Sequence, residues 1–281
     1  MADVSAKDVA ALRKVTGAGM MDCKRALQEN EGDVERAKDW LREKGIAGAA
    51  KRAGRDADQG SIEVIVEGNV GAIVELNCET DFVAKGGVFK QAVASLAKIV
   101  VEHGDADLGS RTIGGETVDD FVKGLSGTLG EKIEVGRVVR FEAADGLIDG
   151  YKHVQNERGV VGVLVELGGV DAGDAKAREV AHDIALHIAS AAPRFVSRDD
   201  VPADEVARER EVLAKQTAEE GKPEQAWPKI VEGKLNGFFK TVALVEQSFV
   251  KDQKQTIGAL VEGLGSGATV RRFARVKIGE D

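Results

Sequence analysis

The sequence predicts an α+β protein in which a helical N-terminal module precedes a duplicated core of β-hairpins and helices. Three observations support this fold class. Apolar residues recur at helical spacing in residues 5–45, and from residue 61 they alternate with polar residues as in β-strands. A strand-like pattern then occurs twice, 91 residues apart. The length of 281 residues is enough for about two domains.

Residues 5–45 predict three short helices. The first helix opens with a capping box, because Asp8 lies three residues after Ser5. The second carries an apolar face, and Asp33 follows a turn as the N-cap of the third, which is expected to stop at Gly45. Because a module of about 40 residues buries little apolar surface, we expect it to be marginally stable.

A linker and the first half of the core follow this module. Residues 47–60 are rich in alanine, glycine and basic residues, a composition typical of linkers. Residues 62–67 and 71–76 alternate with period two around a glycine-containing turn, which predicts a β-hairpin. Helical spacing resumes over residues 88–102.

The core shows an internal repeat. Residues 70–76 (VGAIVEL) and 161–167 (VGVLVEL) are identical at five of seven positions. In the second copy, as in the first, a strand-like segment precedes (about 147–153) and a helical segment follows (about 174–191). This order favours a duplicated β-hairpin and helix unit; the alternative is that any buried strand is rich in valine.

A charged helical stretch interrupts the second half of the core. Residues 204–220 and 228–239 predict two helices joined by a break with glycine and proline, which form an antiparallel helical hairpin. Residues 244–249 and 270–278 are expected to be closing strands. The predicted organisation is a module over 1–46, a linker over 47–60, an N-terminal core subdomain over 61–143, and a C-terminal core subdomain over 144–281 with the hairpin inserted at about 204–240.

Composition narrows the function. The 39 basic and 48 acidic residues give a net charge of −9, which argues against binding the phosphate backbone of nucleic acids. Two cysteines, Cys23 and Cys78, are too few for a disulfide scaffold or a cysteine-based zinc site. No apolar run is nearly as long as the about 18 residues that a membrane-spanning helix needs, and no signal peptide is visible. We therefore expect a soluble cytoplasmic protein that binds neither nucleic acid nor membrane.

Motifs for catalysis are missing from the sequence. It contains no GxxxxGK[ST] phosphate loop, and the glycine-rich segment 263–268 follows a helix instead of a strand. His182 and His187 are five residues apart and so do not share a helix face for metal binding. We therefore expect no enzyme, no cofactor and no metal site.

The segment 77–85 places an acid beside a large aromatic residue between a strand and a helix. In a structural interpretation, Thr80 caps a turn, Asp81 is solvated, and Phe82 with Val83 covers the edge of the sheet. In a functional interpretation, the segment is an exposed wedge, because phenylalanine anchors protein interfaces. The residues alone leave both interpretations open.

Several segments resemble the elongation factor Ts family of bacteria. Residues 16–27 (TGAGMMDCKRAL) and 77–84 (NCETDFVA) match two signatures of that family, and the similarity extends from residue 5 to 278. The resemblance implies a guanine-nucleotide exchange factor for elongation factor Tu that catalyses no bond change. The further matching stretches are 187–193, 220–223 and 230–235.

The resemblance also implies a docking role for the N-terminal helices. They resemble a three-helix module of the ubiquitin-associated type that binds the nucleotide domain of the partner, with Leu12, Met20 and Met21 as apolar contacts. The alternative for these residues is packing within the module. By helical spacing Met20 shares the face of Cys23 and Leu27, whereas Met21 lies off that face.

Thr80, Asp81, Phe82 and Val83 match the family loop that dislodges magnesium from the partner. A GTPase holds GDP partly through Mg²⁺, which neutralises phosphate oxygens and keeps several waters. A wedge that shifts the elements around those waters weakens Mg²⁺ binding, and GDP then leaves faster. His153 matches a family histidine that reaches the phosphate-loop region of the partner; its alternative is a structural role.

Two alternatives to the exchange factor stay open. One is a nucleotide- or metal-dependent enzyme that uses acidic clusters, and the other is a module that binds a GTPase without affecting its nucleotide. The predicted hairpin matches a coiled-coil insertion of the family, and its role in self-association or in partner contacts is open. A homodimer is therefore possible.

Overall fold

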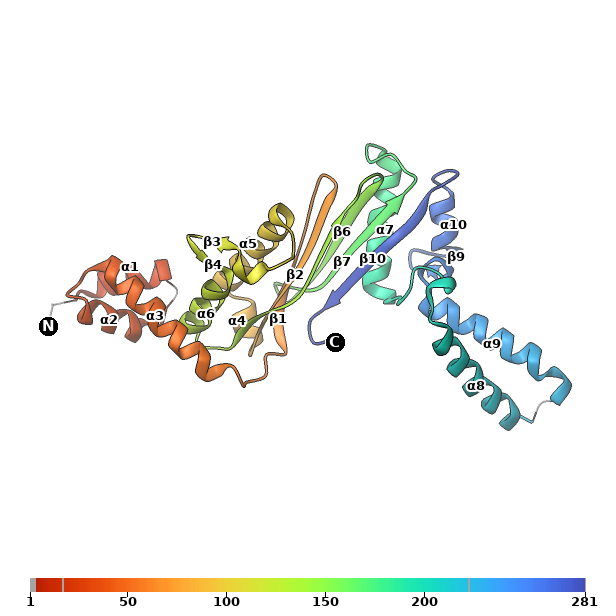
Figure 1. Cartoon of the computed structure of the whole chain (residues 1–281), viewed down its shortest axis with the longest axis horizontal. Coiled ribbons are helices and arrows are strands. Elements are labelled where there is room, and N and C mark those ends of the chain that lie inside the picture. Colours follow the sequence, from red (N-terminus) through yellow and green to blue (C-terminus); the bar gives the residue numbers. More distant parts are fainter. Residues whose placement is uncertain (1–3, 17, 222, 281) are drawn as a thin grey trace. The chain divides into compact units, whose positions relative to one another are not determined.

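A computed structural model of the chain describes residues 4–16, 18–221 and 223–280, with the backbone alone for 46–51. The chain forms two compact units. Unit 1 comprises Met1–Arg140, Lys152–Gly162 and Val276–Asp281, and unit 2 comprises Phe141–Tyr151 and Val163–Arg275. Helices and antiparallel hairpins occur together, in agreement with the predicted α+β class (Figure 1). No helix within the described ranges is both long and apolar enough to cross a membrane.

The three predicted N-terminal helices are present as α1 (Ala6–Thr16), α2 (Met20–Glu29) and α3 (Val34–Arg52). Asp33 caps α3, since its carboxylate accepts the backbone N–H groups of Glu35 and Arg36 at 3.0 and 3.1 Å. The three helices surround a small apolar cluster that includes Leu12, Cys23 and Leu27. A capped, amphipathic bundle thus forms as the periodicity predicts.

The expected stop of the third helix at Gly45 is wrong, because α3 continues to Arg52. Gly45 lies instead against α6 (Val118–Leu129), where a Cβ atom on Gly45 would approach the Cα of Gly127 to 3.3 Å. A Cβ atom on Gly127 would collide with the backbone of Gly45. The glycine therefore permits a close helix crossing, and the following alanine-rich turns continue the helix.

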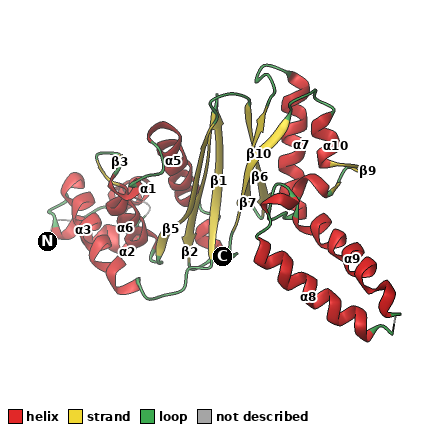
Figure 2. Ribbon diagram, turned by 45° about the vertical axis from the view of Figure 1, so that its right-hand side comes forward, coloured by secondary structure: helices red, strands yellow, loops and turns green. Residues whose placement is uncertain are grey.

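The sheet of unit 1 has the strand order β1-β2-β5. The strands β1 (Gln59–Glu67) and β2 (Val70–Cys78) form the predicted hairpin, with Glu67 paired to Val70 at the turn. The strand β5 (Ile133–Glu142) completes the sheet. The helices α5 (Gly87–His103) and α6 lie on one side of it (Figure 2). Their apolar side chains join those of β2 in the main cluster of this unit.

Several short elements of unit 1 have no counterpart in the prediction. Besides α6 and β5, these are α4 (Asp81–Ala84), η1 (Leu108–Ser110), β3 (Thr112–Ile113) and β4 (Glu116–Thr117). The strands β3 and β4, of two residues each, pair as a short antiparallel hairpin that leads into α6.

The second sheet has the strand order β10-β7-β6. The strands β6 (Leu147–Gln155) and β7 (Arg158–Gly168) form the second predicted hairpin, and α7 (Ala175–Ala191) follows as expected. The predicted closing strand at 270–278 is β10 (Thr269–Lys277). In each sheet, therefore, a hairpin precedes a long helix and a later strand pairs with its second strand. Duplication of an ancestral unit remains a prediction.

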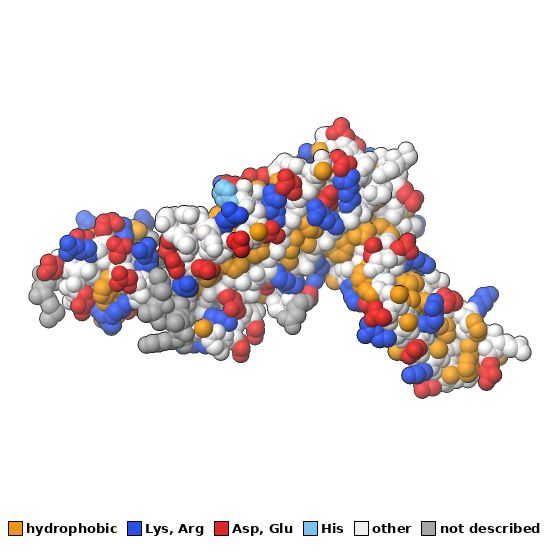
Figure 3. All heavy atoms as spheres, viewed as in Figure 1, with side chains coloured by type: hydrophobic (Ala, Val, Ile, Leu, Met, Phe, Trp, Pro, Cys, Tyr) orange, Lys and Arg blue, Asp and Glu red, His pale blue; other side chains and the backbone are white. Residues whose placement is uncertain are grey.

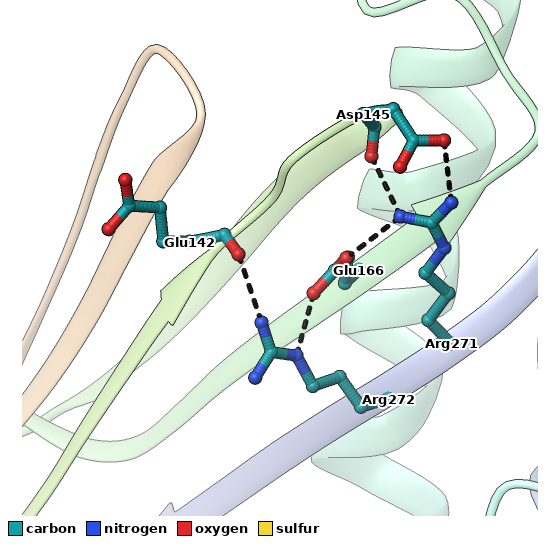
Figure 4. Close-up of polar contacts among 5 residues, drawn as sticks. All are labelled: Glu142, Asp145, Glu166, Arg271 and Arg272. Atoms are coloured by element: carbon teal, nitrogen blue, oxygen red, sulfur yellow. Dashed lines mark hydrogen bonds and ion pairs between the residues drawn. The ribbon is translucent and has the colours of Figure 1, made fainter.

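A buried carboxylate on β7 binds two arginines of β10 (Figure 4). Glu166 is only 4% exposed and accepts hydrogen bonds from Arg272 Nε at 2.6 Å and Arg271 Nη1 at 3.3 Å. Arg271 also donates to the carboxylate of Asp145 at 2.6 Å, and Arg272 donates to the carbonyl of Glu142 at 3.2 Å. The charge of Glu166 is thus compensated where water cannot reach it.

The equivalent position of the first sheet has the same chemistry. Glu75 lies 91 residues before Glu166 in the repeated pattern and is also 4% exposed. The backbone N–H and the Nε of Arg137 on β5 donate to Glu75 Oε2, each at 3.1 Å. In both sheets the added strand supplies the arginine for a buried glutamate.

The predicted helical hairpin is formed by α8 (Ala203–Glu219) and α9 (Trp227–Val242). Its inner face is an apolar cluster that includes Leu213, Leu235 and Phe239. Pro228 lies in the first turn of α9. A backbone N–H at this position has no partner within the helix, so proline, which lacks the N–H, is tolerated there. Some apolar side chains also lie at the hairpin surface (Figure 3), among them Val212, which is 47% exposed.

The strand expected over 244–249 is wrong in its first half. The residues of η4 (Leu244–Glu246) form a 3-10 turn, in which the N–H groups of Glu246 and Gln247 donate to the carbonyls of Ala243 and Leu244. Only β8 (Ser248–Phe249) is extended, and it pairs with β9 (Asp252–Thr256). The helix α10 (Ile257–Glu262) follows.

Candidate protein-interaction site

The short helix α4 starts three residues after β2 and carries the predicted wedge. The hydroxyl oxygen of Thr80 accepts the N–H of Val83 at 3.4 Å and so caps the helix. Ala84 is buried, and the half-buried Val83 packs on the main apolar cluster of unit 1. These contacts anchor one side of α4 to the core.

Phe82 lies on the opposite side of α4 and is 82% exposed. The structural interpretation, in which Phe82 and Val83 together cover the sheet edge, is therefore wrong for Phe82, whereas Val83 packs against the core. A phenylalanine ring is large and apolar, so its exposure on an anchored helix makes Phe82 a candidate contact for another protein.

Asp81, the first residue of α4, is paired with Lys85, which directly follows the helix. Its carboxylate accepts a hydrogen bond from Lys85 Nζ at 2.5 Å, and this bond holds the pKa of Asp81 below its ordinary value. The same ammonium lies 5.8 Å from the centre of the Phe82 ring. The wedge is thus an exposed ring beside an ion pair, and Asp81 is ionised at neutral pH.

The segment before α4 is fixed by two glutamates that the sequence did not single out. Glu131 accepts hydrogen bonds from the N–H and the hydroxyl of Thr80 at 2.9 and 2.5 Å. Glu79 accepts the N–H of Lys132 at 2.6 Å and also binds Arg55. Glu131 lies 51 residues from Thr80, so no local motif reveals the contact.

Cys78 ends β2 beside this segment and is fully buried. Its thiol donates to the carbonyl of Thr80 at 3.2 Å, and burial raises its pKa to about 12. The thiol is therefore neutral at physiological pH and acts as a small packing group.

The turn between β6 and β7 lies near α4 in the same unit. Lys90 of α5 donates to the carbonyl of Glu157, and Arg158 donates to the carbonyl of Gly60 at 2.8 Å. The charge of Arg158 also contributes to the lowered pKa of Asp81. His153 is exposed on β6, shortly before this turn. The turn and the wedge therefore belong to one region of unit 1.

The predicted contacts of the N-terminal helices differ in exposure. Leu12 is 1% exposed and packs inside the bundle, as the alternative interpretation expects. Met20 and Met21 are 57% and 68% exposed. Helical spacing places Met20 on the face of Cys23, but Met20 is exposed because it is the first residue of α2 and lies before the turns that pack in the bundle.

Met20 and Met21 line a groove of about 340 Å³ between α1 and α2. The other lining residues are Val4, Ala6, Val9, Ala10 and Lys24. Flexible methionine side chains adapt to the shape of a bound surface, and the groove is mostly apolar. It is therefore a second candidate contact area.

The histidines of α7 lie in different environments, in agreement with the sequence interpretation. His182 is half exposed and its Nδ1 lies 3.0 Å from Asp149, whereas His187 is buried and its Nε2 lies 2.8 Å from Gln247. Among the residues whose side chains are described, no three His, Cys, Asp or Glu residues are grouped as a metal site requires.

The chain is similar to elongation factors Ts throughout its length. A family model described as elongation factor TS matches residues 79–280. Elongation factor Ts of Micrococcus luteus is 45% identical over 284 residues, which cover 99% of this chain and 100% of the relative. The proteins of the same name from Thermobifida fusca and Mycobacterium avium are each 46% identical, over 287 and 286 residues, with both chains fully covered.

Proposed function

The chain belongs to the elongation factor Ts family, and from this premise we propose that it is a guanine-nucleotide exchange factor for elongation factor Tu. It binds that GTPase in the GDP state and promotes release of GDP by displacing Mg²⁺, so that GTP is loaded during translation elongation. The observation that carries this proposal is Phe82, 82% exposed on a helix whose other side is anchored to the core.

In this mechanism the wedge changes the magnesium site of the partner. Mg²⁺ neutralises phosphate oxygens of GDP and keeps several waters as ligands. Phe82 inserts between the elements that support those waters, and the paired carboxylate of Asp81 stays at the rim with Lys85. Without Mg²⁺ the diphosphate charge is poorly compensated, and GDP dissociates faster.

Linkage then requires the reverse effect. If the factor weakens GDP binding, GDP must weaken binding of the factor by the same ratio. The factor therefore acts as a recyclable catalyst of exchange and changes no covalent bond.

Two further areas dock the partner in this proposal. The groove with Met20 and Met21 binds an apolar surface, and Leu12 supports that groove from inside the bundle. His153 provides a contact beside the β6–β7 turn, in the same unit as the wedge. Thr80 and Val83 hold the wedge in place and contribute its edges.

The test is release of a fluorescent GDP analogue from elongation factor Tu, followed by stopped flow at several magnesium concentrations. The full chain should accelerate release, and the acceleration should shrink when magnesium is already chelated. Phe82→Ala and Asp81→Ala should reduce the maximal release rate strongly and binding only modestly. Val212→Ala, another exposed apolar residue, is the matched control.

Three outcomes would contradict parts of the proposal. Binding without acceleration would leave a passive binding module. Acceleration that is independent of magnesium would keep the exchange function and reject the displacement mechanism. Equal losses of binding and release rate in Phe82→Ala would reject the wedge role of that residue.

A further inference from the structure

We infer that Glu131 is a positioning residue that orients α4, and with it Phe82, through a reciprocal pair of carboxylate contacts. We name the residues Glu79, Thr80, Glu131 and Lys132 the reciprocal clasp. The inference rests on the proposed exchange function, because it assigns to Glu131 a part in the action of Phe82.

The helix α4 is too short to hold its own orientation. It spans four residues, and its region contains few internal backbone bonds, such as those of 3.3 Å from Ala84 to Thr80 and 3.1 Å from Lys85 to Asp81. A single turn is unfavourable in isolation, because one hydrogen bond does not offset the entropy of the ordered residues. The direction of Phe82 therefore depends on what fixes the start of the helix.

Glu131 fixes that start with both carboxylate oxygens. One oxygen accepts the N–H of Thr80 at 2.9 Å, and the other accepts its hydroxyl at 2.5 Å. Because the hydroxyl proton is donated to Glu131, the hydroxyl oxygen is free to accept the N–H of Val83. Hydrogen bonds to a charged acceptor are stronger than neutral ones, so this arrangement defines the rotation of the Thr80 side chain.

Glu79 makes the converse contact. It accepts the N–H of Lys132 at 2.6 Å, so each of two dipeptides provides a carboxylate for a backbone N–H of the other. Arg55 lies 3.1 Å from Glu79. The pKa of Glu79 is lowered, mainly by the hydrogen bond from the backbone of Lys132. The end of β2 is thereby joined to the start of β5.

The backbone of Glu131 is itself held in place. Gly130 adopts a left-handed conformation with φ of 78° and ends α6. The hydroxyl of Ser126 then donates to the carbonyl of Glu131 at 2.5 Å. The clasp therefore connects α4 to the C-terminal end of α6, which packs in the core of unit 1.

The test compares Glu131→Ala with Glu131→Gln and with Glu134→Gln as matched control. Glu134 lies close by, on β5, but it is half exposed and its partner is the side chain of Lys132. We expect Glu131→Ala to lower the maximal GDP-release rate at saturating factor about tenfold. The half-saturating concentration should stay within about twofold, since the docking groove is intact. Glu131→Gln should retain part of the rate, and Glu134→Gln all of it.

A double-mutant cycle with Phe82→Ala separates positioning from an independent contact. If Glu131 acts through Phe82, Glu131→Ala should have little further effect in the Phe82→Ala background. Additive losses would overturn the inference. So would a wild-type release rate in Glu131→Ala, or a loss that appears only in the half-saturating concentration.

Amide hydrogen exchange tests the clasp without the partner. Peptides that cover residues 79–85 should exchange faster in Glu131→Ala and unchanged in Glu134→Gln, at temperatures where both variants are folded. Unchanged exchange in Glu131→Ala would overturn the inference. If the wild-type chain fails to accelerate GDP release, the proposed function fails, and this measurement still decides whether Glu131 orders α4. Glu131→Gln serves where the alanine variant does not fold.

Discussion

At the scale of single residues, His187 shows how burial selects a protonation state. Its side chain is 1% exposed, and its Nδ1 accepts the N–H of Val250 at 3.3 Å. The other nitrogen, Nε2, therefore carries the proton and donates to the carbonyl oxygen of the Gln247 side chain. A second proton would remove the acceptor for Val250, and burial lowers the pKa of His187 below 6.5.

The free energy of unfolding should therefore decrease in mild acid. Because the pKa of His187 is lower in the folded than in the unfolded state, its contribution is complete above about pH 6.5 and is lost as the pH falls below that value. We expect the free energy of unfolding in urea to fall less steeply with acid in His187→Gln than in the wild type. His103→Gln, at a half-exposed position, should keep the wild-type slope. Identical slopes in all three proteins would contradict this role.

The residues of the candidate site were predictable to different degrees. Phe82 and Thr80 belong to one short segment, so the sequence pattern alone marks them. Glu131 reaches Thr80 across 51 residues and an unpredicted turn, and only the folded chain brings the two together. Exposure also separates two residues that the pattern did not distinguish, since Leu12 is buried and Met21 is exposed.

At the scale of elements, the crossing of α3 and α6 depends on glycine. The two helices touch at Gly45 and Gly127, where a side chain on Gly127 has no room. Gly124 is one turn earlier on α6, and a Cβ atom added there would meet no other atom within 4 Å. Two glycines of one helix therefore have different roles.

Alanine substitutions should separate these roles. Gly124→Ala should raise the free energy of unfolding by about 0.5–1 kcal/mol, because alanine restricts the unfolded chain and favours the helix. Gly127→Ala should lower it by about 1–3 kcal/mol, because the methyl group forces the helices apart. Urea denaturation monitored by circular dichroism measures both. A destabilised Gly124→Ala would show that position 124 has no room for a methyl group, and a neutral Gly127→Ala would show that this crossing is not close-packed.

The clarity of the apolar periodicity explains which helices the sequence predicted. The helices α5, α7, α8 and α9 have clear apolar periodicity and appear close to their expected bounds. The helix α6 contains Gly124 and Gly127, which weaken its helical pattern, although Gly127 serves the contact with α3. The strand β5 contains several charged residues, which weaken its strand pattern in the sequence. One of them, Arg137, pairs with Glu75 of β2, so the strand is stabilised by a residue far away in the chain.

At the scale of the whole molecule, the helical hairpin is a self-contained insertion. Its helices share an apolar cluster, which Phe195 and Val201 join from the preceding segment, and the chain enters and leaves the hairpin at neighbouring points. The N–H groups of Arg194 and Phe195 both donate to the carbonyl of Val242, at 2.9 and 3.0 Å. If a short loop replaced the hairpin, it would therefore have only a short gap to close.

Replacement of residues 203–240 by a short glycine and serine linker should therefore leave a folded protein. We expect one cooperative thermal transition, and acceleration of GDP release within about twofold of the full chain, because the hairpin belongs to unit 2 and the wedge to unit 1. Loss of the cooperative transition would show that the hairpin is part of the core. A folded variant with lost acceleration would instead assign the hairpin a contact with the partner.

The order of the strands along the chain also has a consequence during synthesis on the ribosome. Glu75 meets Arg137 after 62 further residues, whereas Glu166 waits 105 residues for Arg271. At about 5–20 residues per second, these intervals are about 3–12 s and about 5–20 s. The nascent second sheet thus exposes an unpaired strand edge for longer than the first, and it is the half of the molecule on which a ribosome-associated chaperone has most time to act.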